Sequence, residues 1–111
     1  MTVTALLLLV WCHFIGDFIF QSDKVAINKS KDNAVLLKHV AIYMLPFIWV
    51  GTVFYVVNMV LHFVTDYFSS RACSKLYAAG ERHWFFVVIG LDQFIHYATL
   101  IGTWAWLAEA A

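Results

Sequence analysis

Apolar residues dominate four long stretches of the chain, separated by short polar or glycine-containing segments. A helix needs about 20 mostly apolar residues to cross the roughly 30 Å hydrocarbon layer of a bilayer. The polar stretch 22–33 is interpreted as a connection or an interfacial helix, and Pro46 is expected to kink the second helix. The pattern predicts an all-α, polytopic membrane protein with a single four-helix domain over residues 1–111. The expected transmembrane helices span about 3–21, 34–50, 52–78 and 83–108.

Composition supports a membrane protein and indicates its orientation. Hydrophobic residues make up 63% of the chain and charged residues 13%, and the mean hydropathy is +0.79, far above a typical soluble domain. A formal net charge of zero gives no electrostatic reason to expect a nucleic acid partner. All seven basic residues lie in or beside the connections 22–38 and 71–82. The positive-inside rule therefore predicts a bacterial inner-membrane protein with cytoplasmic connections and both termini in the periplasm.

Ionisable side chains inside the apolar stretches provide the candidate chemistry. The segments 13–18 and 62–67 share the order His-Phe-aliphatic-x-Asp-aromatic, and the i, i+4 spacing places each imidazole and carboxylate on one helix face. An unpaired Asp near the centre of a membrane helix costs about 2.5–3.5 kcal/mol, and most of these residues lie roughly 6–13 Å from the cytoplasmic boundary. They are expected to converge on one metal site, with ligands His13, Asp17, His39, His62, Asp66, Asp92 and His96.

The ligand types suit a divalent transition metal, with Zn first and Mn or Fe as alternatives, as one or two ions. The repeated motif also predicts two helical hairpins related by an approximate twofold axis along the membrane normal. His39 and His96 come from the second helix of each hairpin, whereas Asp92 has no counterpart and is expected to bridge two ions or act as a base. This symmetry predicts similar losses of metal from His13→Ala and His62→Ala.

A distinctive motif series covers residues 8 to 100. It reads His13-x-x-x-Asp17-Phe18-x-x-Gln21, Lys29, His39-x-x-x-Tyr43, His62-Phe63-x-x-Asp66-Tyr67 and Asp92-Gln93-x-x-His96. In this series the chain resembles a family of small bacterial and phage membrane proteins of unknown function. The resemblance implies the helical fold and the membrane location, and it carries no activity. The HxxxD spacing is more distantly similar to inner-membrane metal-dependent hydrolases, which is an analogy of pattern.

The leading functional hypothesis is an intramembrane metal-dependent hydrolase acting on a lipid or isoprenoid phosphoester at the cytoplasmic leaflet. A metal there would activate water and polarise the phosphoryl oxygen, with Asp92 as base or bridging ligand. Gln21 and Gln93 are expected to orient ligands or substrate. An anionic headgroup is the expected partner of Lys24, Lys29 and Lys31, although the positive-inside rule alone also explains these lysines.

Two other classes of function stay open, and the sequence leaves undecided whether the chain is an enzyme. One is a membrane binding or regulatory module with a structural metal or a polar network, whose partner is a second copy or another membrane protein. The small residues Ala98 and Gly102 offer a weak dimerisation face. The other is transport of metal ions or protons, against which no continuous polar path is visible beyond the site. Helix packing is the expected role of Tyr43, Gly16 and Gly90.

Overall fold

The computed structural model describes residues 2–110, which are helical apart from short turns and contain no strand. The fold class is therefore all-α, as the sequence predicts. In chain order the elements are α1 (Val3–Phe14), the π-helix η1 (Ile15–Ile19), α2 (Asp23–Asn28), α3 (Asn33–Tyr43), the 3-10 helix η2 (Leu45–Phe47), α4 (Thr52–Ala78) and α5 (Arg82–Ala110).

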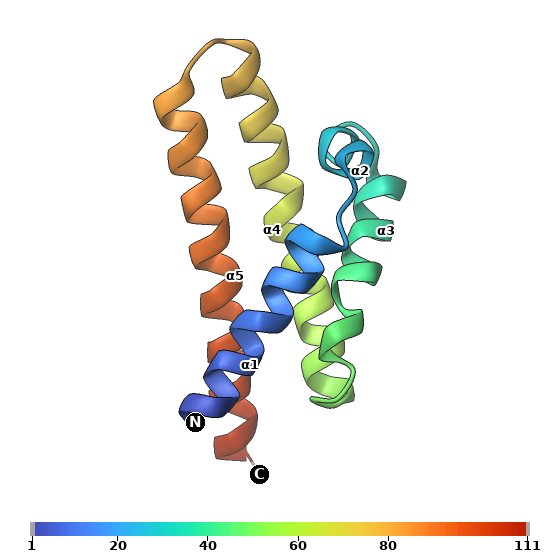
Figure 1. Ribbon diagram of the computed structural model, residues 1–111, viewed down its shortest axis with the longest axis vertical. Helices are drawn as coiled ribbons and strands as arrows, with labels where there is room; N and C mark the ends of the chain where they lie inside the picture. Colours follow the sequence, from blue (N-terminus) through green and yellow to red (C-terminus); the bar gives the residue numbers. More distant parts are fainter. Residues whose placement is uncertain (1, 111) are drawn as a thin grey trace.

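The two long helices α4 and α5 form an antiparallel hairpin along the 47 Å axis of the molecule (Figure 1). α1 crosses this hairpin obliquely, and α3 lies beside α4 on the side away from α5. α1 begins and α5 ends at one end of the bundle, while the α4–α5 turn lies at the opposite end (Figure 1). The first half of the chain thus folds as shorter, separate pieces against a long hairpin, and the two halves are unequal in shape.

Local sequence explains where most helices begin and end. The side chains of Thr2, Ser22 and Asp32 accept hydrogen bonds from backbone amides in the first turns of α1, α2 and α3, which is the usual N-cap arrangement. Gly80, with a φ of 75°, makes the tight turn between α4 and α5. Pro46 has no amide hydrogen to continue an α-helix, and α3 ends at Tyr43 before a 3-10 turn. The second helix is therefore shorter than the expected 34–50.

Close packing between η1 and α3 depends on Gly16. A Cβ atom at this position would lie 2.5 Å from the backbone oxygen of Tyr43 and 2.8 Å from its ring atom Cδ2. Only glycine fits at that distance, so the packing role expected for Gly16 is confirmed. At Gly90 an added Cβ would meet nothing within 4 Å, so the close approach expected there is wrong.

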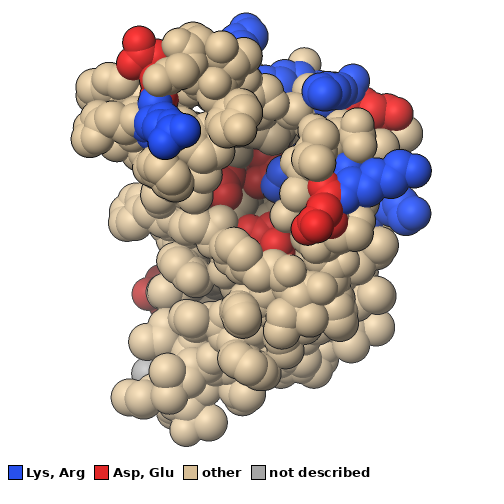
Figure 2. Space-filling model, turned by 45° about the horizontal axis from the view of Figure 1, so that its top comes forward, with Lys and Arg blue, Asp and Glu red and all other residues tan. Residues whose placement is uncertain are grey.

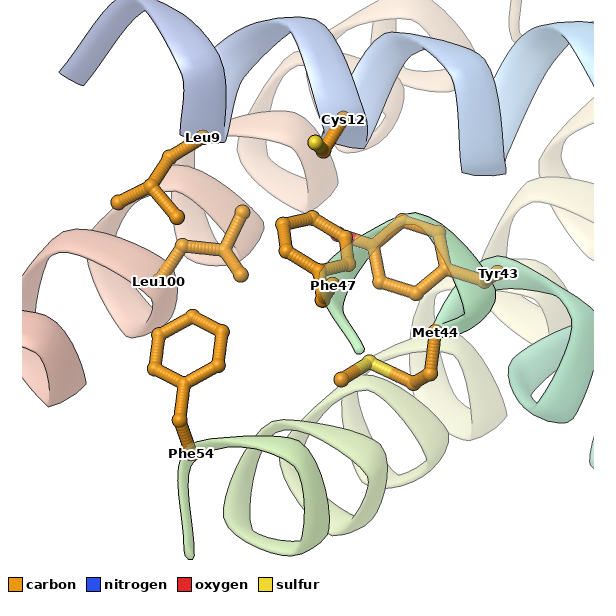
Figure 3. Packing of buried hydrophobic residues seen from close by; sticks show 7 residues of the cluster. All are labelled: Leu9, Cys12, Tyr43, Met44, Phe47, Phe54 and Leu100. Atoms are coloured by element: carbon orange, nitrogen blue, oxygen red, sulfur yellow. The ribbon is translucent and has the colours of Figure 1, made fainter. Parts of the chain in front are cut away.

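A compact apolar cluster fills the half of the bundle nearer the ends of α1 and α5. Leu9, Cys12, Met44, Phe47 and the other members come from four parts of the chain and point toward one another (Figure 3). Tyr43 belongs to this cluster through its ring, which is 1% exposed. The cluster closes one side of the polar interior described below, because the Tyr43 ring separates apolar neighbours from the histidines.

The bounds of the other helices lie close to the expected ones. α4 coincides with the predicted 52–78, α5 extends slightly beyond 83–108, and α1 with η1 ends at Ile19 instead of residue 21. Within residues 2–110, α5 is the one helix both long and apolar enough to cross a membrane by itself. The segments Val3–Ile19 and Asn33–Phe47 are shorter apolar helices, and α4 is long but carries a polar face.

Candidate metal centre

The polar face of α4 is the scaffold of the site. Asn58, His62, Asp66 and Ser70 follow one another at intervals of four residues and are all buried, because residues four apart share a helix face. The other helices direct ionisable side chains toward the middle of this face. They are His13 from α1, Asp17 from η1, His39 from α3, and Asp92 and His96 from α5. All seven residues expected at the site therefore meet in one interior cluster.

Four of these side chains converge closely. Asp17, His39, His62 and Asp66 each present a ligand atom, and these atoms lie within 4.8 Å of one another. The Nε2 atoms of His39 and His62 are 3.3 Å apart, and they lie 3.2 and 3.1 Å from Asp66 Oδ2. Asp17 Oδ1 lies 3.1 Å from His39 Nε2 and 3.8 Å from His62 Nε2. A tetrahedral ion with bonds of about 2.0–2.2 Å separates its ligand atoms by about 3.3–3.6 Å, close to these distances.

A second, overlapping group contains Asp17, Asp92 and His96. His96 Nε2 lies 3.0 Å from Asp66 Oδ1 and 3.2 Å from Asp92 Oδ2. Asp66 therefore presents Oδ2 to the first group and Oδ1 to His96. Asp17 belongs to both groups, and Asp66 links the first group to the second through its contact with His96. Asp92 is a member of the second group only, and its role as a bridging ligand or base stays a prediction.

The site has an excess of negative charge. Asp17 and Asp66 are almost fully buried, and the Asp92 side chain is 13% exposed. Among the described residues, the lysine or arginine paired with these carboxylates is Lys29, whose Nζ donates to Asp66 Oδ2 at 3.2 Å. With neutral imidazoles, three carboxylates and one ammonium leave two negative charges without a partner. Buried charges require compensation, which one divalent cation can supply, as can protonated imidazoles such as that of His96 between Asp66 and Asp92.

Lys29 reaches the site from the end of α2, outside the long helices. Burial by itself would lower the pKa of Lys29, but the carboxylates of Asp66, Asp17 and Asp92 together outweigh this effect and raise the pKa above the ordinary 10.5. Lys29 is therefore a permanent cation beside the site. Lys29 and Lys31 both line the cavity described below, whereas Lys24 is exposed and is not part of that lining. The structure thus places two of the three expected substrate lysines at the site.

His13 lies beside the ligand groups, not within them. Gln93 Nε2 donates to Asp17 Oδ2 at 3.2 Å and Asp92 Oδ2 at 3.0 Å, so its Oε1 faces His13 Nε2 at 2.6 Å. An amide oxygen only accepts, which places the imidazole proton on Nε2 and leaves Nδ1 to accept from the Tyr43 hydroxyl at 2.7 Å. The chain Tyr43–His13–Gln93 therefore holds two carboxylates in place. His13 is a positioning residue, and the direct ligand role expected for it is not what the geometry offers.

A cavity of about 770 Å³ leads to the carboxylates from the charged end of the molecule. Acidic side chains are visible inside a hollow of the space-filling surface, below a rim that carries basic residues (Figure 2). Its lining combines Asp17, Lys29 and Gln93 with apolar side chains such as Phe18 and Phe85. Gln21 and Ser70 also line the cavity, and their buried oxygens Oε1 and Oγ have no hydrogen-bond partner. The cavity thus offers unused polar atoms to a ligand.

The family of the chain follows from a comparison with protein-family profiles. A family described as "Protein of unknown function (DUF3307)" matches residues 3–110. The chain belongs to this family. Searches of curated proteins and of solved structures gave no match. The expected family resemblance is therefore confirmed, and none of the comparisons supports the more distant similarity to metal-dependent hydrolases.

In this DUF3307 chain, sequence reasoning missed several contributors to the site. Ser70, which lines the cavity, extends the four-residue spacing of His62 and Asp66, so the spacing alone indicated it. Ser69, which donates to Asp92 Oδ1 at 2.5 Å, had no such signal. Tyr43 was expected to pack, and it does so, but its hydroxyl also begins the hydrogen-bond chain through His13. Both contacts join residues from different helices.

Proposed function

We propose that this protein is a multi-pass membrane protein with a buried metal-dependent hydrolytic centre near the cytoplasmic face. The distribution of side chains supports a lipid environment. Leu7, Phe68 and Phe94 are 62–68% exposed on α1, α4 and α5, whereas His62, Asp66 and other polar groups are buried. A soluble bundle has the opposite arrangement, while lipid favours an apolar exterior around satisfied polar groups.

Four helical segments reach across the bilayer in this proposal. The shorter ones, Val3–Ile19 and Asn33–Phe47, are about 22–25 Å long at 1.5 Å per residue. A short span is accommodated by local thinning of the bilayer or by flanking side chains that extend to the interface. The lysines and arginines visible in Figure 2 gather at one end of the molecule, which we assign to the cytoplasm of a bacterial inner membrane.

Cysteine labelling in membrane vesicles tests this topology. Ser30→Cys and Ile48→Cys place single thiols at opposite ends of the bundle, in a background where Cys12 and Cys73 are replaced by Ala and Ser. We expect a membrane-impermeant maleimide to label the first only in inside-out vesicles and the second only in right-side-out vesicles. Labelling of both from one side would contradict a multi-pass topology, and the reversed pattern would contradict the orientation.

One observation carries the metal proposal, which is the convergence of two imidazoles and two carboxylates at spacings of 3.1–3.8 Å. This ligand set suits Zn best, with Mn or Fe as alternatives. A bound divalent ion would lower the pKa of a coordinated water and neutralise charge on a phosphoryl oxygen. Lys29 and Lys31 would attract the anionic phosphoester through the cavity, and Gln93 would hold Asp17 and Asp92 in position.

The cavity supports a substrate with one charged end. It opens at the end of the molecule assigned to the cytoplasm, and its lining is largely apolar around the lysines and carboxylates. We therefore propose a phosphoester carried by a lipid or isoprenoid chain. Asp92 belongs to the second ligand group and lines the cavity, where its carboxylate would serve as a ligand or as the general base of the proposed hydrolysis.

Metal analysis combined with phosphate release tests the proposal. Detergent-purified wild type, Asp66→Ala and the exposed control His83→Ala would be analysed by inductively coupled plasma mass spectrometry and then assayed against phosphatidic acid and prenyl phosphates. We expect one or two equivalents of a transition metal and phosphate release in the wild type and the control, and loss of both in Asp66→Ala.

Two outcomes would redirect the proposal. Bound metal that is lost in Asp66→Ala without any turnover would assign the ion to structure, as in a binding or regulatory module. Absence of metal after incubation with Zn or Mn would show that the cluster is a polar network.

A further inference from the structure

A second hollow, of about 410 Å³, follows the seam between α4 and α5. The side chains that line it are almost wholly apolar, and some of them are exposed on the surface. Phe68 is 68% exposed and Leu91 is 53% exposed. On α4 the lining positions recur at helical spacing over residues 64–72, which corresponds to about 12 Å along the axis. The lining residues are Val64, Thr65, Phe68, Ser69, Ala72, Val88, Leu91, Asp92 and Ile95. We call this hollow the α4–α5 groove.

The groove and the metal-centre cavity meet at two residues. Ser69 and Asp92 line both hollows, and the Ser69 hydroxyl donates to Asp92 Oδ1 at 2.5 Å. The other oxygen of Asp92 lies 3.2 Å from His96 Nε2 at the edge of the second ligand group. A molecule seated in the groove is therefore separated from the candidate metal centre by this one hydrogen-bonded pair.

The polarity of the two hollows differs sharply. In the groove, Thr65 donates its hydroxyl to the backbone oxygen of Leu61 at 2.8 Å, and Ser69 donates to Asp92, so the donors are already used. A polar occupant would find few partners there and would lose its hydration. The cavity across the pair presents Lys29 and Lys31, which attract an anion. Together the two hollows suit an amphiphile with a hydrocarbon chain and an anionic end.

We propose that the α4–α5 groove seats the hydrocarbon chain of the substrate, so that a chain-linked phosphoester enters sideways from the bilayer and presents its phosphate past Ser69 and Asp92. This inference rests on the proposed function and adds the place where the chain of that substrate binds. It excludes soluble phosphate monoesters as good ligands, because they have no chain to occupy the groove. The exposed rim of the groove is in contact with lipid in the proposed orientation, so no other opening is needed for the chain.

Photo-crosslinking tests the groove without requiring turnover. The probe is a prenyl phosphate with a diazirine at the end of its chain, added to the metal-loaded, full-length protein in detergent or nanodiscs. Ala72→Trp fills the groove and leaves the cavity unchanged, because Ala72 lines only the groove. Ala98→Trp is the matched control, since Ala98 is exposed on α5 and lines neither hollow.

We expect mass spectrometry to find labels on Val64, Phe68 and Ile95 in wild type and Ala98→Trp. Labelling should be about tenfold lower in Ala72→Trp, because the indole would occupy the space of the hydrocarbon chain. The corresponding diazirine alcohol without phosphate should label the groove much less. Labelling that is equal for the alcohol, unaffected by Ala72→Trp, or spread over all lipid-facing helices would overturn the proposal.

The same samples separate this inference from the proposed hydrolytic function. Groove labelling without any phosphate release would keep the chain-binding site and refute hydrolysis. Phosphate release from a prenyl phosphate with labels elsewhere would keep hydrolysis and refute the groove.

Discussion

The sharpest prediction compares two histidines that the repeated motif treats as equivalent. His62 presents Nε2 to the four-ligand group, 3.3 Å from His39 Nε2 and 3.1 Å from Asp66 Oδ2. His13 uses both ring nitrogens on Tyr43 and Gln93, and its Nε2 lies 3.8 Å from Asp17 Oδ2. His62→Ala should therefore remove a ligand, whereas His13→Ala should only loosen the carboxylates that Gln93 holds.

The expected magnitudes follow from this difference. A four-ligand Zn site binds with about 10–16 kcal/mol in total, or about 2.5–4 kcal/mol per ligand, so loss of His62 should weaken Zn binding about 10²–10³-fold. Loss of a residue that orients ligands typically costs about 10–100-fold in metal affinity. We therefore expect His62→Ala to bind Zn about tenfold more weakly than His13→Ala.

Competition with a fluorescent Zn chelator measures these affinities on detergent-purified protein. Circular dichroism on the same samples checks that both variants keep their helices, and His83→Ala serves as the exposed control. Equal losses of Zn affinity in the two variants would show that His13 and His62 have equivalent roles, as the repeated motif predicts. A larger loss from His13→Ala would refute the assignment of the ligand groups.

Three further predictions concern other parts of the site. Gln93→Leu should lower Zn affinity about 10–100-fold in the same chelator assay, because Asp17 and Asp92 lose their common donor; unchanged affinity would contradict the orienting chain. Gly16→Ala should destabilise the protein by about 1–3 kcal/mol in thermal unfolding, whereas Gly102→Ala, where a Cβ meets nothing within 4 Å, should be neutral or stabilising. Lys29→Met should reduce binding of a prenyl phosphate to the metal-loaded protein more than Lys24→Met does. Equal effects would mean that both lysines only orient the protein in the membrane.

Much of the fold follows from local sequence. Apolar runs long enough for helices, N-cap residues such as Ser22 and Asp32, and Gly80 at the turn all act over a few residues, which is why the bounds of α4 and α5 are close to those expected. The end of the second helix is shifted because Pro46 acts together with packing. The sulfur of Cys12 contacts the Pro46 carbonyl oxygen at 3.3 Å, a contact between residues distant in sequence.

The π-helix at Ile15–Ile19 shows why the internal symmetry was overestimated. The amide of Phe20 donates to the carbonyl of Ile15 at 2.9 Å, so this turn is wider than the regular turn around Asp66. His13 Nε2 lies 3.8 Å from Asp17 Oδ2 and faces Gln93 Oε1 instead, whereas His62 Nε2 lies 3.1 Å from Asp66 Oδ2. Identical spacing in the sequence therefore gives different geometry in the two halves.

The sequence by itself determined the helical class, the buried polar face of α4 and the identity of the seven ionisable residues, because helical periodicity and the cost of a buried charge are local properties. The tertiary structure alone decided that Asp17 belongs to both ligand groups, that Asp66 contacts His96, that His13 contacts Gln93, and that Lys29 reaches the site from a connection. These contacts depend on how each helix is rotated about its axis and how closely its neighbours approach. The rotation and spacing of the helices are set by contacts between residues up to 80 positions apart in the sequence.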